Sequence, residues 1–288
     1  MLAIYKKELK SYFTSLIGYV FIAFFLAIIG LFFSITNIYN SIPDFVATLN
    51  GFSIYVFMFL VPIITMRIMA DENKQKTDQL LLTSPLSLKD IILGKYFAVL
   101  SIYGIVMLIS CIYPKIMSSY GVVNLKANYT GIFGYFLMGG AFLAIGLFIS
   151  TLTDNQLIAA VVTFLVILFV TFIDGIASLI PTDNKSAWIV FSLIVVIIAV
   201  IIYVVMHNVV VALGVAALGE AVLTVIYFVK PQFFDGSVVK VFNWFSVVSR
   251  FDNFASQIFD ISALIYYVSV IIAFNFLAIQ ALNKRRWS

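Results

Sequence analysis

The stretch IFGYFLMGGAFLAIGLFIS, residues 132–150, decides the fold class of this chain. It contains no charged residue and is about 20 residues long, the length at which an α-helix crosses the roughly 30 Å hydrocarbon core of a bilayer. Similar runs fill most of the sequence. Of its 288 residues, 63% are hydrophobic and 10% are charged, whereas a soluble domain has roughly 45–50% apolar residues. We therefore predict a polytopic, all-α membrane protein.

About eight transmembrane helices are expected. The predicted spans are 17–35, 52–69, 91–113, 132–150, 156–179, 188–206, 209–229 and 262–282. Only His207 and Asn208 separate the sixth span from the seventh. One helix over both would be about 63 Å long at about 1.5 Å per residue, too long for a single crossing. This part of the chain is therefore expected to form a tight hairpin or a re-entrant segment.

The basic residues give the orientation. With both termini in the cytoplasm, the cytoplasmic side receives eleven of the 17 basic residues: Lys6, Lys7, Lys10, Arg67, Lys74, Lys76, Lys89, Lys95, Lys284, Arg285 and Arg286. This bias follows the positive-inside rule. It also explains the net charge of +4 without nucleic-acid binding. We predict a multi-pass protein of the bacterial cytoplasmic (inner) membrane.

Residues 1–16 are predicted to form an amphipathic helix in the cytoplasmic interface. Apolar residues recur at three- and four-residue spacing from Leu2 to Leu16, and charged residues occupy the other side. The residues of interest are Tyr5, Lys6, Lys7, Glu8 and Leu9. A plain membrane anchor would show the same pattern. No small-residue cleavage site follows the first apolar run, so we expect a retained helix rather than a signal peptide.

The loop DENKQKTDQLLLTSPLSLK, residues 71–89, is the long polar stretch between the first spans. Its three leucines, residues 80–82, are too few to span a membrane. A short helix is expected to end before Pro85, because proline disfavours a helical conformation at the residue that precedes it. Ser87 and Asp90 form a capping signature for the third span. The leucines would pack against the membrane surface or, as we favour, fit a groove on a cytoplasmic partner.

The residues around this loop resemble those of a known family. The matching segments are PIITMR (62–67), ADE (70–72), Thr77, LLLTSP (80–85) and GK (94–95), together with YKKEL (5–9), AIGLFIS (144–150) and KRRW (284–287). They resemble ABC-2 type permeases, most closely the gliding-motility-associated branch. The chain departs from that pattern at Leu16, Lys76, Gln79 and Gln257, and its residues 181–231 add two spans to the usual six.

The resemblance implies the permease subunit of an ATP-driven exporter that works by alternating access. It implies a second permease chain, identical or different, and separate ABC ATP-binding subunits. The implied ATPase-coupling residues are Arg67, Asp71, Glu72, Thr77, Asp78, Leu80, Leu81, Leu82, Thr83 and Pro85. The sequence contains no P-loop G-x-x-x-x-G-K-[ST], so ATP and Mg are expected on the partner. The chain itself would be no enzyme and would bind no cofactor.

The predicted organisation is a single permease domain over residues 1–288. Its parts are the interface helix 1–16, the coupling loop 71–89, an extra helical hairpin 181–231 and an external segment 232–261. The aromatic residues of the external segment would form an interfacial belt or short re-entrant helices. A gate over the exit path is the alternative.

Two acidic residues fall within predicted spans, where ionisable groups are costly and often functional. Glu220 lies near the middle of the seventh span, among small residues that let helices approach closely, and Asp174 lies toward the outer end of the fifth. Glu220 would join two helices as a neutral, hydrogen-bonded group, or serve an ion-gradient-driven transporter or channel that needs no ATPase. Arg67 is expected to pair with Glu72 or Glu8. One cysteine and one histidine predict no metal site.

Overall fold

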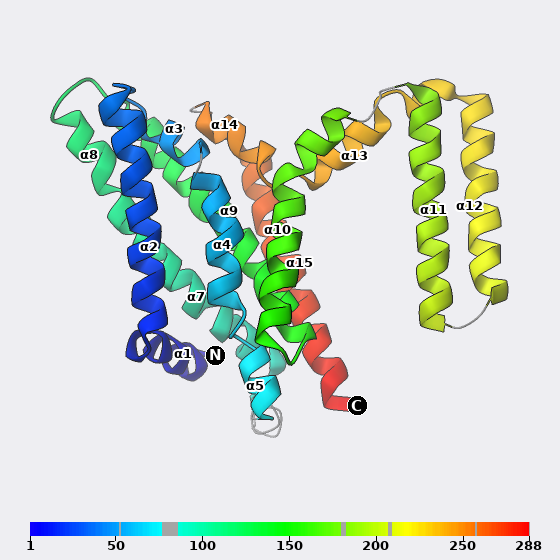
Figure 1. Ribbon diagram of the computed structural model, residues 1–288, viewed down its shortest axis with the longest axis horizontal. Coiled ribbons are helices and arrows are strands. Elements are labelled where there is room, and N and C mark those ends of the chain that lie inside the picture. The colour runs from blue at the N-terminus through cyan, green and yellow to red at the C-terminus, as the bar shows by residue number, and fades with distance from the viewer. Residues whose placement is uncertain (52, 77–85, 180–182, 207–208, 257, 288) are drawn as a thin grey trace. The chain divides into compact units, whose positions relative to one another are not determined.

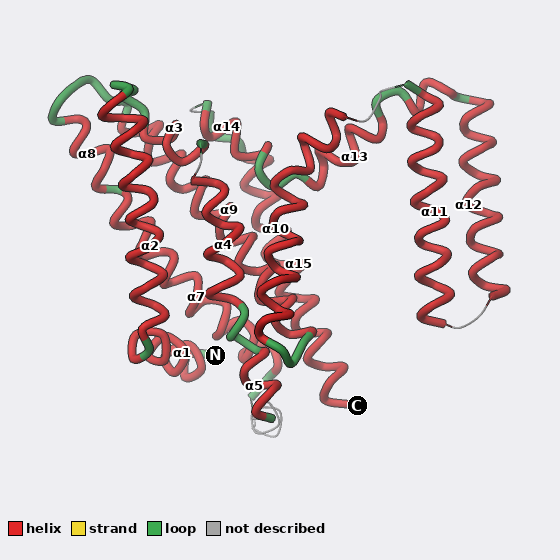
Figure 2. The backbone as a smooth tube through the Cα atoms, viewed as in Figure 1, coloured by secondary structure: helices red, strands yellow, loops and turns green. Residues whose placement is uncertain are grey.

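The computed structural model describes residues 1–51, 53–76, 86–179, 183–206, 209–256 and 258–287, and these contain helices and no strands (Figure 1; Figure 2). Within this described part, six stretches are long and apolar enough to cross a membrane. They are Leu16–Tyr39, Ile54–Lys74, Leu88–Ser118, Leu125–Leu152, Gln156–Leu179 and Ile261–Arg285. They coincide with the first five predicted spans and the last. The prediction of a polytopic all-α membrane protein is thereby confirmed.

Helix packing divides the chain into two compact units, Met1–Phe169 with Val247–Ser288 (unit 1) and Val170–Ser246 (unit 2). The helices of unit 1 are α1 (Leu2–Thr14), α2 (Leu16–Phe33) with η1 (Ser34–Tyr39), α3 (Phe45–Asn50), α4 (Ser53–Thr65), α5 (Ala70–Gln75), α7 (Leu88–Ser110), α8 (Ile112–Ser118), α9 (Leu125–Leu152), most of α10 (Gln156–Leu179), η3 (Ser249–Phe251), α14 (Asp252–Ala255) and α15 (Ile261–Trp287). The single permease domain stays a prediction.

Helix α9 is the centre of unit 1. In its most apolar stretch 78% of the residues are buried, more than in any other of the six spans described. Glycines allow this close packing: a Cβ at Gly146 would lie 2.4 Å from Oγ1 of Thr65 on α4. A Cβ at Gly134 would lie 2.6 Å from the ring of Phe254 on α14. Small residues thus let α4 and α14 approach the backbone of α9, as is common between membrane helices.

Aromatic side chains fill the space between α2, α4, α7 and α9. The ring of Phe57 lies 5.7 Å from Phe25, 5.8 Å from Tyr103, 4.9 Å from Tyr135 and 5.4 Å from Phe142, measured between ring centroids. All five side chains are buried. The Tyr103 hydroxyl donates a hydrogen bond to the Tyr135 carbonyl at 2.8 Å, so the polar end of this ring is satisfied. This cluster holds four helices of unit 1 in register.

Both chain termini lie at the same end of unit 1, beside α1 and α5 (Figure 1). We call it the basal end. Helix α1 forms as predicted and ends at Ser15, which adopts an extended conformation before α2 begins. At this end the Arg285 guanidinium pairs with Asp154, and the Asn73 amide donates to the Thr153 carbonyl at 3.2 Å. These contacts tie α15 and α5 to the residues that follow α9.

The segment 232–261 contains short helices, and the re-entrant position expected for them stays a prediction. Two of them, η3 and α14, pack within unit 1. Phe251 and Phe254 are fully buried there, and Tyr135 on α9 contacts Phe251 with ring centroids 5.8 Å apart. The prediction of an interfacial belt is therefore wrong for these two side chains. They belong to the core because α9 offers glycine at the place where Phe254 packs.

Unit 2 contains a hairpin of α11 (Asn184–Met206) and α12 (Val209–Val229), followed by η2 (Pro231–Phe234) and α13 (Ser237–Phe245). The hairpin prediction is confirmed; the turn itself lies outside the described residues. Ala187, Phe234 and Val238 form the buried centre of the unit. Within α11, the stretch Asn184–Val200 is apolar but shorter than a span, and Leu213–Val229 reaches span length only with Pro231–Phe245, across a bend of 113°. Two further full crossings therefore remain a prediction.

Candidate functional site

The second span is interrupted at the basal end. Helix α4 ends at Thr65, α5 begins at Ala70, and residues 66–69 form turns. Pro62, inside α4 one turn earlier, cannot donate a backbone hydrogen bond and favours a kink. The Ile68 amide donates to the Thr65 carbonyl at 3.1 Å instead of to Ile64, as an α-helix would require. The break thus frees backbone groups that must find other partners.

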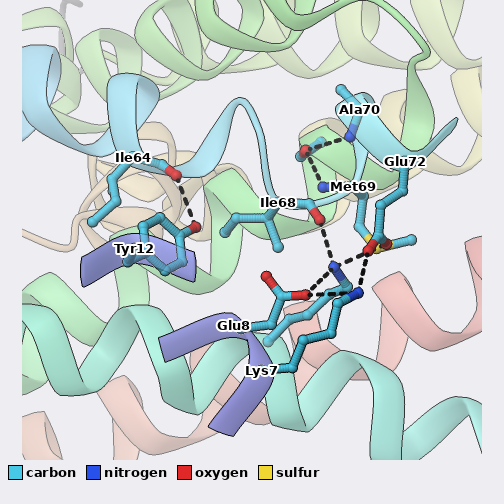
Figure 3. Close-up of polar contacts among 10 residues, drawn as sticks. Lys7, Glu8, Tyr12, Ile64, Ile68, Met69, Ala70 and Glu72 are labelled. Atoms are coloured by element: carbon cyan, nitrogen blue, oxygen red, sulfur yellow. Dashed lines mark hydrogen bonds and ion pairs between the residues drawn. The ribbon is translucent and has the colours of Figure 1, made fainter. Parts of the chain in front are cut away.

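Ser150 of α9 bonds to the middle of the break. Its Oγ accepts hydrogen bonds from the amides of Met69 at 3.1 Å and Ala70 at 3.2 Å (Figure 3). It also donates to the Met66 carbonyl at 3.3 Å. The Ser150 side chain is fully buried. One hydroxyl therefore satisfies three backbone groups of the break and attaches it to the central helix of unit 1.

Tyr12 of α1 bonds to the end of α4, the helix before the break. Its hydroxyl donates to the Ile64 carbonyl at 3.4 Å, the group that the break releases (Figure 3). Burial, and next the negative charge of Glu8, raise the pKa of the Tyr12 hydroxyl well above its ordinary value. Tyr12 therefore stays protonated and remains a donor.

Lys95 of α7 bonds to the break itself and to α5, the helix after it. Its ammonium Nζ donates to the Ile68 carbonyl at 2.9 Å and to Glu8 Oε1 at 3.1 Å. It also forms an ion pair with Glu72 Oε2 at 2.9 Å, and only 1% of the lysine side chain is exposed. A buried charge is tolerated when it is paired and hydrogen-bonded. Lys95 meets this condition by joining α1, the break and α5.

Further charges surround this contact. Lys7 Nζ lies 3.5 Å from Glu72 Oε1 and 3.8 Å from Glu8 Oε1, but 63% of its side chain is exposed. Arg67 Nε lies 3.4 Å from Asp71 Oδ2. Glu72 and Glu8, the partners predicted for Arg67, are therefore wrong. Arg67 pairs with Asp71, which lies one helical turn further along the chain. We call these six residues the basal cluster: Lys7, Glu8, Arg67, Asp71, Glu72 and Lys95.

The six side chains of the basal cluster border a cavity of about 210 Å³ between α1, the break and α5. The other lining residues are Ser11, Tyr12, Ser15, Ile17 and Ile68. Three basic and three acidic groups balance one another around it. The cavity leaves room beside the break in the direction of α1.

Gly94, next to Lys95, explains how α1 comes so close to α7. A Cβ at Gly94 would lie 3.1 Å from the Ile4 side chain and 3.2 Å from the Met1 carbonyl. Further along α1, the Tyr5 hydroxyl and Ser101 Oγ lie 2.9 Å apart in a hydrogen bond. At the start of α7 the Asp90 amide donates to Ser87 Oγ at 3.1 Å, which confirms the predicted cap.

The structure brings together five of the residues singled out from the sequence: Lys7, Glu8, Arg67, Asp71 and Glu72. Lys6 is exposed, and Leu9 is half-buried. The remaining predicted coupling residues lie outside the described part of the chain: Thr77, Asp78, Leu80, Leu81, Leu82, Thr83 and Pro85.

Sequence reasoning missed Lys95 and Ser150 as site residues. Lys95 lies within the predicted third span, so the rule that singled out Glu220 and Asp174 would also have found it. No comparable signal marks Ser150, because a serine in an apolar helix usually bonds its own preceding turn.

The two acidic residues singled out in the spans each have a serine partner within unit 2. Glu220 Oε1 of α12 accepts a hydrogen bond from Ser192 Oγ of α11 at 2.7 Å. Asp174 Oδ2 of α10 accepts one from Ser246 Oγ at 2.5 Å. The Glu220 contact fits the predicted role of joining two helices. Among the described residues, no group of three His, Cys, Asp or Glu side chains could hold a metal ion.

Comparison with known proteins places this arrangement in a family. A family model described as ABC-2 family transporter protein matches residues 33–187, more than half of the chain. The match includes the break, α5, α7 with Lys95, and α9 with Ser150. No curated protein matches the chain significantly. The chain belongs to the ABC-2 transporter family and is therefore a permease component of the ABC transporter type, a multi-pass membrane protein.

Proposed function

We propose that this chain is the membrane-spanning subunit of an ATP-driven exporter and that a separate subunit hydrolyses ATP. The observation that carries the proposal is the break between α4 and α5. It stands directly before the segment that resembles the coupling loop of ABC-2 permeases, and side chains from three other helices support it: Tyr12, Lys95 and Ser150. A force on the loop would reach these helices first.

The proposed mechanism follows from this geometry. The ATPase would dock on the loop 71–89 from the cytoplasm. The basal end would then face the cytoplasm. The basic residues around that end support this orientation. When the ATPase subunits close on ATP and Mg, α5 would pivot at residues 66–69. The attached helices would follow, as in hinge motions generally, and open the exit path by alternating access between two permease chains.

The proposal is tested by purification from native membranes. The chain, tagged at its C-terminus, is extracted in mild detergent, and the proteins that accompany it are identified by mass spectrometry. We expect a stoichiometric protein with a Walker-A motif whose ATPase activity depends on this chain. Its reproducible absence beside intact, folded chain would refute the proposal. Transport by the purified chain alone under an ion gradient would then support the secondary transporter or channel.

Two charge insertions make the test specific to the loop. Leu81→Asp should abolish co-purification of the ATPase and leave membrane insertion intact, because it places a charge within the leucine patch. Val122→Asp is the matched control, since Val122 is 98% exposed in the connection between α8 and α9. That connection lies at the end of unit 1 opposite to the basal end (Figure 1). Normal ATPase recovery with Leu81→Asp would contradict docking through this loop.

A further inference from the structure

We propose that α1 is a splint across the break in the second span and that Lys95 is the positioning residue that fastens it. In this arrangement α1 and α5 move as one body when the loop is displaced. The inference rests on the proposed function for its nucleotide dependence, but the fastening itself is a property of this chain alone.

The first argument is where α1 is attached. The Tyr12 hydroxyl bonds to the Ile64 carbonyl, in the last turn of α4. Four residues earlier in α1, Glu8 meets Lys95, which in turn holds the Ile68 carbonyl and Glu72 of α5. One helix is thereby connected to the chain before and after residues 66–69. Bending at the break must carry α1 along or separate one of these connections.

The second argument is that, among the residues the structure describes, Lys95 makes the buried connection between Glu8 and Glu72. Its ammonium lies within 3.1 Å of one carboxylate from α1 and of one from α5. Lys7 also reaches both carboxylates, but at 3.5 and 3.8 Å and from an exposed position where solvent screens the attraction. Without Lys95 the carboxylates of Glu8 and Glu72 would face each other, and the Ile68 carbonyl would lose its side-chain donor.

The third argument is that Ser150 and Lys95 have different roles at the break. Ser150 bonds to the amides of Met69 and Ala70 from α9, the most buried helix, and so fixes the point about which α5 turns. Lys95 bonds to the Ile68 carbonyl and, in addition, to one carboxylate of α1 and one of α5, and its long, flexible stem can follow these two helices. The two residues therefore differ in role: Ser150 sets the pivot, and Lys95 sets what turns with it.

Spin-label distances test the splint. Cys111→Ser removes the one native cysteine, and Lys10→Cys on α1 with Lys74→Cys on α5 provides two exposed labelling sites. A second pair, Lys74→Cys with Leu157→Cys on α10, reports movement of α5 relative to α10. Double electron–electron resonance is recorded on the permease with its ATPase in lipid nanodiscs, without nucleotide and with a non-hydrolysable ATP analogue and Mg.

We expect the distance between α1 and α5 to be narrow and equal in both nucleotide states, while the distance between α5 and α10 shifts. Lys95→Met should broaden the distribution of distances between α1 and α5 and make that distance differ between the two nucleotide states. Glu8→Ala, which leaves Lys95 paired with Glu72 and so spares the fold, should do the same. Lys126→Met, an exposed lysine in the first turn of α9 and outside the proposed docking loop, is the control and should change neither distance.

Two results would overturn the splint. One is a narrow, unchanged distance between α1 and α5 in both Lys95→Met and Glu8→Ala. The other is a nucleotide-dependent change of that distance in the parent protein. If no ATPase accompanies the chain, the proposed function fails, but the nucleotide-free distributions of the permease alone still decide whether Lys95 fastens α1 to α5.

Discussion

Removing the Ser150 hydroxyl should destabilise the protein far more than removing another buried serine hydroxyl. In Ser150→Ala the amides of Met69 and Ala70 and the Met66 carbonyl lose their side-chain partner. An unsatisfied buried polar group costs about 1–3 kcal/mol. Taking the low end for each of three groups, because the break can relax, gives about 3 kcal/mol. At roughly 2–4 °C per kcal/mol for a chain of this size, the unfolding midpoint should fall by about 10 °C.

Ser110→Ala is the matched control. Ser110 is equally buried, but its Oγ donates at 2.9 Å to the Val106 carbonyl in its own helix. Removing the Ser110 hydroxyl therefore takes no hydrogen bond away from another segment. It should cost about 1 kcal/mol or less. Thermal unfolding in detergent, followed by tryptophan fluorescence, compares the two variants. A midpoint for Ser150→Ala no lower than that for Ser110→Ala would refute the idea that this hydroxyl holds the break.

Three further outcomes are expected. Gly146→Ala should lower the thermal midpoint in the same assay, because its Cβ would lie within 2.4 Å of the facing threonine on α4. Glu220→Gln should retain the hairpin contact, since the amide oxygen still accepts from Ser192 Oγ, whereas Glu220→Ala should weaken it; cysteine cross-linking between α11 and α12 measures this. A hydrogen bond from the Asn253 side chain lowers the pKa of Asp260, which also caps α15. The ionised Asp260 carboxylate therefore contributes to stability above the ordinary pKa of 3.8, and this contribution is lost as the pH falls through the lowered pKa. Hydrogen exchange in the first turn of α15 should show that loss in the parent protein but not in Asp260→Asn.

The features predicted correctly from the sequence are those that depend on nearby residues. Apolar runs of membrane length gave the six spans, and the spacing of Ser87 and Asp90 gave the cap of α7. The short distance between two apolar runs required a hairpin or a re-entrant segment, and α11 and α12 form the hairpin. Each of these depends on residues within one helix or one turn, where periodicity and length are informative.

The basal cluster shows where such reasoning stops. Helical periodicity placed Glu8 on the polar side of α1, yet it lies between Ile4 and Tyr12, one turn from each, on the face that packs against the other helices of unit 1. Its partner Lys95 is 87 residues away in the chain. A charged residue on a buried face looks like a polar-face residue unless its partner is known, so the sequence could indicate an amphipathic helix but not its orientation.

The side chains of Tyr12, Lys95 and Ser150 explain why a broken helix is tolerated here. A break inside a bilayer leaves backbone groups that lipid cannot satisfy, so it must be enclosed by protein or open to water. Here three side chains from three helices provide the partners, and the cavity of about 210 Å³ lies beside them. A straight helix would need none of this. The break and its supports together fit a joint at residues 66–69, and in the proposed splint Lys95 is the group that makes α1 part of the moving side.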